Sequence, residues 1–184
     1  MFRIAASLLA VPALILSACG PTTSSEGQSD ASQTPVERGQ YLVSISGCHD
    51  CHTVRGTEPI GSAARPNLAG SDSELHIKGL GVFVPPNITP DRETGLGGWT
   101  EEQIADAIQK GLRPDGRILS PAMPWEPLYS HFTREDALAV AAYLKSIPAV
   151  HNRTPDPRGP DDTDDPAFLK TVPRRDLPPP PDGK

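Results

Sequence analysis

The feature that most constrains this chain is a pair of cysteines three positions apart, followed at once by a histidine. These residues are Cys48, Cys51 and His52, in the run Cys-His-Asp-Cys-His. Two thiols at this spacing can each form a thioether bond to one porphyrin, and the adjacent imidazole can then bind the iron from one face. We therefore expect one haem c, attached through Cys48 and Cys51, with His52 as an axial ligand.

Three other uses of such a cysteine pair are a zinc half-site, a thioredoxin-like dithiol and a structural disulfide. A zinc site of the usual kind needs a second Cys or His pair at ligand spacing, and the sequence contains none. A thioredoxin motif lies between a strand and a helix, whereas a helix-like segment precedes Cys48. The haem interpretation therefore explains the motif best.

Residues 1–18 have the composition of an export signal peptide. Arg3 supplies positive charge, and the apolar run Ile4–Leu16 is shorter than the roughly 20 residues that span a bilayer as a helix. The run Leu-Ser-Ala-Cys that ends at Cys19 resembles the processing box of bacterial lipoproteins, which implies lipidation of Cys19. Ordinary cleavage near Ala18, leaving a free thiol, is the alternative. We expect a protein on the periplasmic side of the bacterial envelope, anchored to a membrane by lipid.

The composition changes again along the rest of the chain. Residues 19–34 are rich in Ser, Thr, Gly and Gln, which predicts a flexible tether. Residues 35–150 hold nearly all of the apolar periodicity and are expected to form one small domain. Residues 151–184 are rich in Pro and Asp, which predicts an extended or disordered tail. The net charge of −6 argues against nucleic acid as a partner.

Three helices are predicted, and no sheet. The first spans about Val36–Ser46, where small and apolar residues recur at spacings of three and four. The second helix begins with a capping box at Thr100, and this helix stops near Gly111. The third follows a weaker capping box at Thr133 and ends before Pro148. The segment between the haem motif and the second helix is rich in Gly and Pro. The sequence thus predicts an all-α domain with long loops around one haem.

A second axial ligand of the iron is expected at Met123. The only other methionine, Met1, is lost with the signal peptide. Met123 stands in the run Pro-Ala-Met-Pro-Trp, where the prolines restrict the backbone and can hold a weak sulfur ligand with little loss of entropy. A His/Met pair is a known ligand set for haem c. The alternatives are that Met123 fills a gap in the core, or that another histidine binds the iron: His76, His131 or His151.

The chain resembles class I cytochromes c over about residues 35–152. The resemblance rests on four segments: Arg38–Leu42, Arg65–Gly70, the Met123 loop and Ala141–Leu144. It implies a cytochrome c fold, in which the first and last helices cross where a small residue meets an aromatic one. Gly39 and Tyr143 are the candidates for this crossing.

The same resemblance implies roles for residues around the haem. The carbonyl of Pro66 would accept a hydrogen bond from His52 Nδ1–H and so orient the imidazole. Leu68 would pack on the ring. Separately, Trp99 is a candidate to line the haem pocket or to hydrogen-bond a propionate, and the alternative is that it belongs only to the core.

A closer resemblance is to the cytochrome c subunits of membrane-bound alcohol and gluconate dehydrogenases. It rests on four segments: Pro86–Asp91, Gly95–Thr100, Gly111–Arg117 and Pro121–Pro124. Those subunits contain three haem domains, whereas this chain has a single Cys-x-x-Cys-His motif. The resemblance therefore implies a monohaem carrier of single electrons rather than an enzyme, and no catalytic residues are expected.

The expected partners are periplasmic or membrane-bound redox proteins, namely a dehydrogenase, a quinol-oxidising complex or a terminal oxidase. Contact with a membrane is expected only through the N-terminal lipid. Two rival hypotheses come from other classes. If Met123 lies away from the iron, an open distal position would make this a haem-based ligand-binding or peroxidase-like protein. Without haem, the chain would be a binding module of the envelope.

Overall fold

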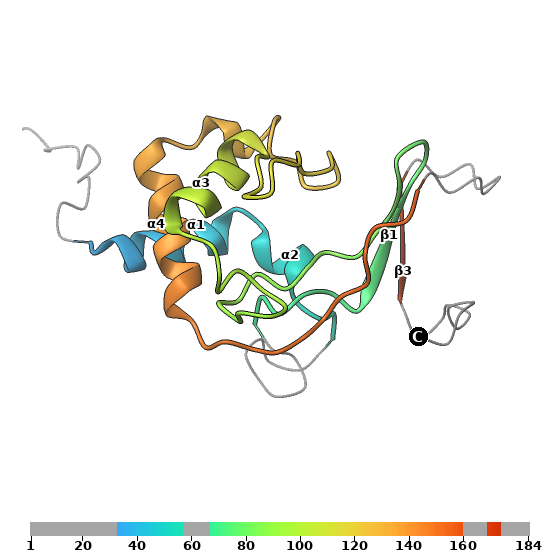
Figure 1. The fold of residues 1–184 in the computed structure, drawn as a ribbon, viewed down its shortest axis with the longest axis horizontal. Coiled ribbons are helices and arrows are strands. Elements are labelled where there is room, and N and C mark those ends of the chain that lie inside the picture. The colour runs from blue at the N-terminus through green and yellow to red at the C-terminus, as the bar shows by residue number, and fades with distance from the viewer. Residues whose placement is uncertain (1–32, 57–66, 160–168, 174–184) are drawn as a thin grey trace, which may run out of the picture. The chain divides into compact units, whose positions relative to one another are not determined.

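The computed structural model describes residues 33–56, 67–159 and 169–173. The predicted signal peptide, Cys19, Pro66 and most of the predicted tether and tail lie outside these residues. Figure 1 shows the elements, which in chain order are α1 (Pro35–Ile45), α2 (Cys48–His52), β1 (Ser73–Ile77), β2 (Gly81–Phe83), α3 (Glu101–Lys110), the 3₁₀ helix η1 (Tyr129–His131), α4 (Arg134–Ser146) and β3 (Leu169–Pro173).

The three predicted helices are confirmed as α1, α3 and α4, and local capping accounts for their ends. At the start of α1, Thr34 Oγ1 accepts a hydrogen bond from Glu37 N, and the Glu37 carboxylate accepts one from Thr34 N. Thr100 and Gln103 form the same reciprocal pair at the start of α3. Gly111 ends α3 with a φ of 65°, a left-handed conformation that glycine adopts without steric cost.

Helices α1 and α4 cross at very short range. A Cβ placed on Gly39 would lie 1.9 Å from Ala139 O and 2.8 Å from Tyr143 Cβ, so only glycine allows this approach. The expected meeting of Gly39 and Tyr143 is confirmed. The buried apolar core lies around this crossing and consists of Leu42, Val43, Leu68, Ile104, Ala139, Val140, Ala141 and Leu144.

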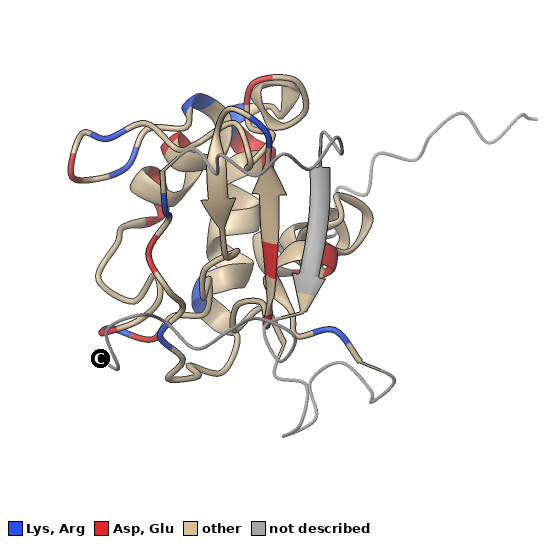
Figure 2. Cartoon of the chain, turned by 90° about the vertical axis from the view of Figure 1, so that its right-hand side faces the viewer, with Lys and Arg blue, Asp and Glu red and all other residues tan. Residues whose placement is uncertain are grey.

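The prediction of a domain without a sheet is wrong. The three short strands form an antiparallel sheet in the order β2-β1-β3, and Figure 2 shows this sheet in front of the helices. A hairpin joins β1 to β2, whereas β3 comes from the Pro-rich end of the chain. Strands this short give a weak periodic signal, and the pairing of β1 with β3 is not local in sequence.

After α4 the chain runs back along the domain toward the sheet (Figure 1). Val150 N donates a hydrogen bond to Thr89 Oγ1 at 3.1 Å, and Asn152 Nδ2 donates one to Ala69 O at 2.7 Å. Arg158 then pairs with Val82 of β2 through two backbone hydrogen bonds of 3.0 and 3.2 Å. Residues 150–159, called the return segment below, therefore connect the helical part to the hairpin.

Candidate haem-binding site

The predicted haem motif forms a single helical turn, α2, directly after α1. Gly47 precedes it with a φ of 72°, and Asp50 N donates a hydrogen bond to Gly47 O at 3.0 Å. Residues three apart in a helix lie on the same face, so this turn brings the thiols of Cys48 and Cys51 to one side. Both are free thiols: Cys48 is half-buried and packs against the core, whereas Cys51 is exposed. This geometry suits two bonds to one planar group.

The thiols do not have the character of a reactive dithiol. Burial raises the pKa of Cys48 to about 11, and burial also raises the pKa of Cys51. Thioredoxin-like motifs need the opposite shift, because the thiolate is the reactive form.

His52 is buried and has a defined tautomer. Its Nδ1 lies 2.8 Å from the carbonyl oxygen of Pro86. A carbonyl can only accept, so Nδ1 must donate, and in the neutral ring the lone pair is then on Nε2. Burial lowers the pKa of His52, which favours the neutral form. A neutral imidazole with its Nδ1–H held by a carbonyl is the form that binds iron. The residues present therefore fit a haem ligand.

The carbonyl that orients His52 is therefore that of Pro86, and the expectation that Pro66 does so is wrong. Pro66 itself lies outside the described residues. Val84–Pro86 follow β2 directly and bring the chain back to α2, which is why the carbonyl of Pro86 reaches the ring.

A turn at Leu68 joins α2 to the segment that contains Pro86. Leu68 N donates to Thr53 Oγ1 at 3.1 Å, and Ile88 N donates to Leu68 O at 3.0 Å. Gly70 N donates to the carbonyl of His52 at 2.8 Å. Leu68 is fully buried in the core and has a φ of 56°, which costs a non-glycine residue about 1–2 kcal/mol. Its predicted packing on the haem ring stays a prediction.

The loop that contains Met123 is fixed at both of its ends. Trp125 Nε1 donates to Leu119 O at 3.2 Å, and the ring of Trp125 covers Gly111, where a Cβ would lie 2.5 Å from it. On the other side, the hydroxyl of the buried Tyr129 donates to Ser46 O at 2.9 Å, two residues before Cys48. Burial raises the pKa of Tyr129 to about 12, which keeps this hydroxyl a donor. The chain after Met123 is thus attached beside the haem motif, but the axial role of Met123 stays a proposal.

Trp99 is half-buried and packs against the core. The guanidinium of Arg113 lies over its ring, 5.5 Å from the centroid. Lys145 Nζ donates to the carbonyls of Gly97 and Trp99 at 3.1 and 3.0 Å, which fixes the backbone on the other side. Arg113 Nε is buried and lies 3.4 Å from Asp115 Oδ2, so an ion pair rather than a hydrogen bond accompanies it.

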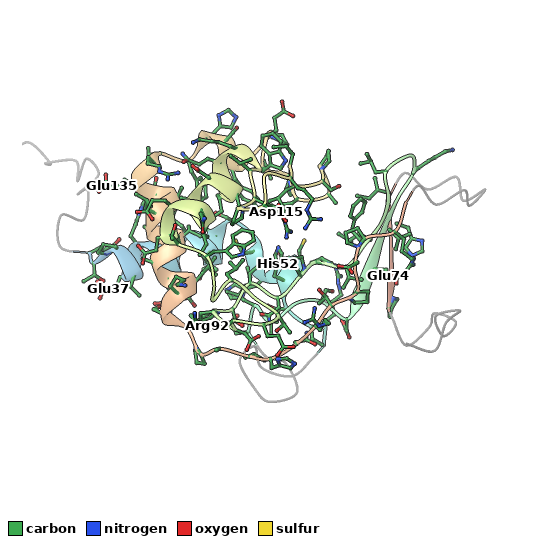
Figure 3. All side chains as sticks on the ribbon, viewed as in Figure 1. Glu37, His52, Glu74, Arg92, Asp115 and Glu135 are labelled. Carbon is green, nitrogen blue, oxygen red and sulfur yellow. The ribbon has the colours of Figure 1, made fainter. Side chains whose placement is uncertain are left out.

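The three competing histidines lie in different places. His76 is on β1, where its Nε2 is 3.0 Å from the carboxylate of Glu74. His131 and His151 are exposed. Figure 3 shows His52 in the middle of the molecule and Glu74 at the sheet. The sequence interpretation missed Glu74, which is buried and forms two hydrogen bonds of 2.9 and 2.8 Å with Arg158. These two residues are 84 positions apart, so no local pattern could have paired them.

Comparison with known proteins identifies the family. The family model described as Cytochrome c matches residues 36–148, which include the haem motif, helices α3 and α4, and all of α1 except Pro35. This chain belongs to the cytochrome c family. The domain is therefore an electron carrier of the kind that holds haem c covalently, and the spacing of Cys48, Cys51 and His52 is the one that this attachment needs.

Similar proteins include subunits of dehydrogenases. The cytochrome c subunit of the quinone-type alcohol dehydrogenase of Gluconobacter oxydans is 35% identical over 132 residues, which cover 69% of this cytochrome and 25% of that protein. The gluconate 2-dehydrogenase cytochrome c subunit of Pantoea cypripedii is 32% identical over 117 residues, or 62% of this cytochrome and 23% of that protein. The predicted resemblance is confirmed, and this cytochrome spans about a quarter of the length of these subunits.

Within residues 33–56, 67–159 and 169–173, the cytochrome contains no helix with the length and apolar character needed to cross a bilayer.

Proposed function

We propose that this cytochrome binds a single haem c through Cys48 and Cys51, with His52 and Met123 as axial ligands, and carries single electrons between redox proteins. The observation that carries the proposal is the hydrogen bond from His52 Nδ1 to Pro86 O, because it fixes the tautomer and the orientation that an iron ligand needs. The bound haem supplies the one-electron chemistry.

The residues of the chain have separate tasks in this proposal. Helix α2 presents the two thiols on one side, and Pro86 holds the imidazole of His52 in place. Leu68 is fully buried in the core and helps to keep water away from the haem. A thioether ligand from Met123 raises the reduction potential relative to a second histidine. No residue is assigned a catalytic role.

The proposed partners follow from the relatives, which are named as cytochrome c subunits of alcohol and gluconate dehydrogenases. We propose a dehydrogenase, a quinol-oxidising complex or a terminal oxidase as the donor or acceptor. The N-terminal residues support a place on the periplasmic side of the envelope, with a lipid on Cys19. Mass spectrometry of the mature N-terminal peptide should then show a lipid mass on Cys19, and an unmodified Cys19 there would contradict lipid anchoring.

The axial ligands are tested with spectra of Met123→Ala beside the parent. Loss of the weak sulfur-to-iron charge-transfer band, together with new binding of carbon monoxide by the reduced form, supports Met123 as ligand. The matched controls are His131→Ala and His151→Ala, which remove the exposed competing histidines and should leave both properties unchanged. An unaltered spectrum in Met123→Ala would reject this ligand and favour the haem protein with an open distal position.

Covalent attachment is tested by mass spectrometry of the mature protein, made together with the haem attachment machinery. The parent should carry the mass of one haem, and a Cys48→Ser, Cys51→Ser double variant should carry none. A parent without added mass would remove the whole proposal.

A further inference from the structure

The β1-β2 hairpin has two unlike faces. Leu75 is paired with Phe83, and Ile77 with Gly81. Directly paired residues, and residues two apart along one strand, have their side chains on the same face of a sheet. Leu75, Ile77 and Phe83 therefore share one face, which we call the apolar face. Glu74 and His76 alternate with them and lie on the other face.

The polar face is the one that the chain itself covers. Arg158 reaches Glu74 with both of its terminal nitrogens, at 2.9 and 2.8 Å, and His76 binds the same carboxylate at 3.0 Å. Val82 pairs with His76 and therefore lies on this face too. Glu74 and Val82 are both buried, with 3% and 4% of their surface exposed.

The hairpin lies beside the haem motif. Figure 2 shows the sheet in front of the helices, and Figure 1 shows it seen from the side, with α2 between the sheet and α1. The chain path agrees. Phe83, the last residue of β2, is three positions before Pro86, whose carbonyl holds His52. Three residues span at most about 11 Å, so the apolar face begins close to His52.

The apolar face is also incompletely covered by the chain. Ile77 is buried, but Leu75 and Phe83 remain half-exposed. The hairpin is held firmly in this position, because Arg158 pairs with Val82 along the outer edge of β2.

We propose that the apolar face of the hairpin is one wall of the haem pocket, with Leu75 and Phe83 in contact with the porphyrin. The inference rests on the proposed function, since it needs a haem on α2. The wall takes no part in axial ligation. It keeps water from the ring, and a drier ring disfavours the charged ferric form and raises the reduction potential.

The contact is tested by NMR of the reduced, diamagnetic holoprotein. A porphyrin ring current shifts nearby protons strongly, upfield over the face of the ring and downfield at its edge. The methyl signals of Leu75, assigned by their loss in Leu75→Ala, should therefore lie far outside the range of ordinary leucine methyls. Leu80, at the turn of the same hairpin and 42% exposed, is the matched control and should have ordinary shifts. If mass spectrometry shows that the protein carries haem but the Leu75 methyls have ordinary shifts, the contact of this face with the porphyrin is contradicted. The proposed function would remain intact.

The effect on the haem is tested by the reduction potential. The Leu75→Ala, Phe83→Ala double variant should have a lower midpoint potential than the parent, whereas Leu80→Ala should match the parent. Met123 should remain bound in each variant, as shown by its charge-transfer band. An unchanged potential in the double variant would overturn the role of the wall. Leu75 signals that move with protein concentration instead of with haem would identify the face as a contact between copies of this chain and would likewise overturn it.

Discussion

Gly39 is the residue with the least room for change. Its missing Cβ lets α1 approach Ala139 O and Tyr143 Cβ at distances that no side chain permits. Gly39→Ala should therefore force the two helices apart and destabilise the protein by about 1–3 kcal/mol or more. Denaturant unfolding measures the loss. Gly98→Ala is the control, because no atom lies within 4 Å of a Cβ placed there. Equal stability of the two variants would contradict the close crossing.

Glu74 is the buried charge that depends most on its partners. The hydrogen bonds from Arg158, and then that from His76, hold the pKa of Glu74 below its ordinary value of 4.5. A carboxylate with a lowered folded pKa stabilises the protein above its unfolded pKa, and that contribution is lost as the pH falls through the folded pKa. Stability should therefore decline below about pH 4.5.

Glu74→Gln should lower the free energy of unfolding by about 1.5–3 kcal/mol at pH 7, which is the contribution of hydrogen bonds to a charged group. The variant should also lose less stability than the parent as the pH falls. Unfolding by denaturant at pH 7 and pH 4 measures both effects. Glu93→Gln is the control: Glu93 is 70% exposed and lies 3.4 Å from Arg153, so its loss should cost less than about 0.5 kcal/mol. A Glu74 variant with the stability and acid response of the parent would argue against a structural role for this pair.

At the scale of elements, the end of α3 positions the Met123 loop. Gly111 has a left-handed φ of 65°, and the ring of Trp125 lies where its Cβ would be. Trp125 in turn holds Leu119 O. An alanine at Gly111 must therefore both adopt an unfavourable backbone and displace the ring.

Gly116 allows these two costs to be separated. It has a φ of 81°, but no atom lies within 4 Å of a Cβ placed there. Gly116→Ala should cost only the backbone strain, about 1–2 kcal/mol. Gly111→Ala should cost more, change the tryptophan fluorescence and weaken the charge-transfer band of the proposed Met123 ligand. If the two variants had the same stability and the same spectra, Trp125 would not couple α3 to the loop.

For the whole molecule, the return segment couples the helices to the sheet. Asn152 binds the carbonyl of Ala69 in the turn beside His52, and Arg158 binds Val82 and Glu74. Removing residues after Arg153 should leave Glu74 buried without its main partner, and the amide of Val82 should exchange faster with deuterium. Amides within α1 and α4 should keep their protection, because those helices pack on each other.

A chain that ends after Gly159 is the matched control, since it keeps Arg158 and both of its bonds to Val82. In this shorter chain the amide of Val82 should stay protected. Equal protection of Val82 in both truncated chains would show that the return segment does not hold the hairpin.

The sequence alone determined those parts of the cytochrome that depend on near neighbours. The Cys48–His52 motif is five residues long, the caps at Thr100 and Thr133 act within one turn, and Gly111 ends its helix by its own conformational freedom. Such features need no knowledge of the fold. The tertiary structure decided which proline holds His52, because Pro66-Asn67-Leu68 and Pro86-Asn87-Ile88 have the same local pattern and only the path of the chain brings one carbonyl to Nδ1.

The same reason explains the sheet and the pair of Glu74 with Arg158. Strands of three to five residues carry too little periodicity to be recognised, and the pairing of β1 with β3 joins segments that are far apart in the sequence. The buried carboxylate of Glu74 is stabilised because the return segment places the guanidinium of Arg158 within hydrogen-bond distance of it. Contacts of this kind come from chain closure over long separations, which no local run of residues encodes.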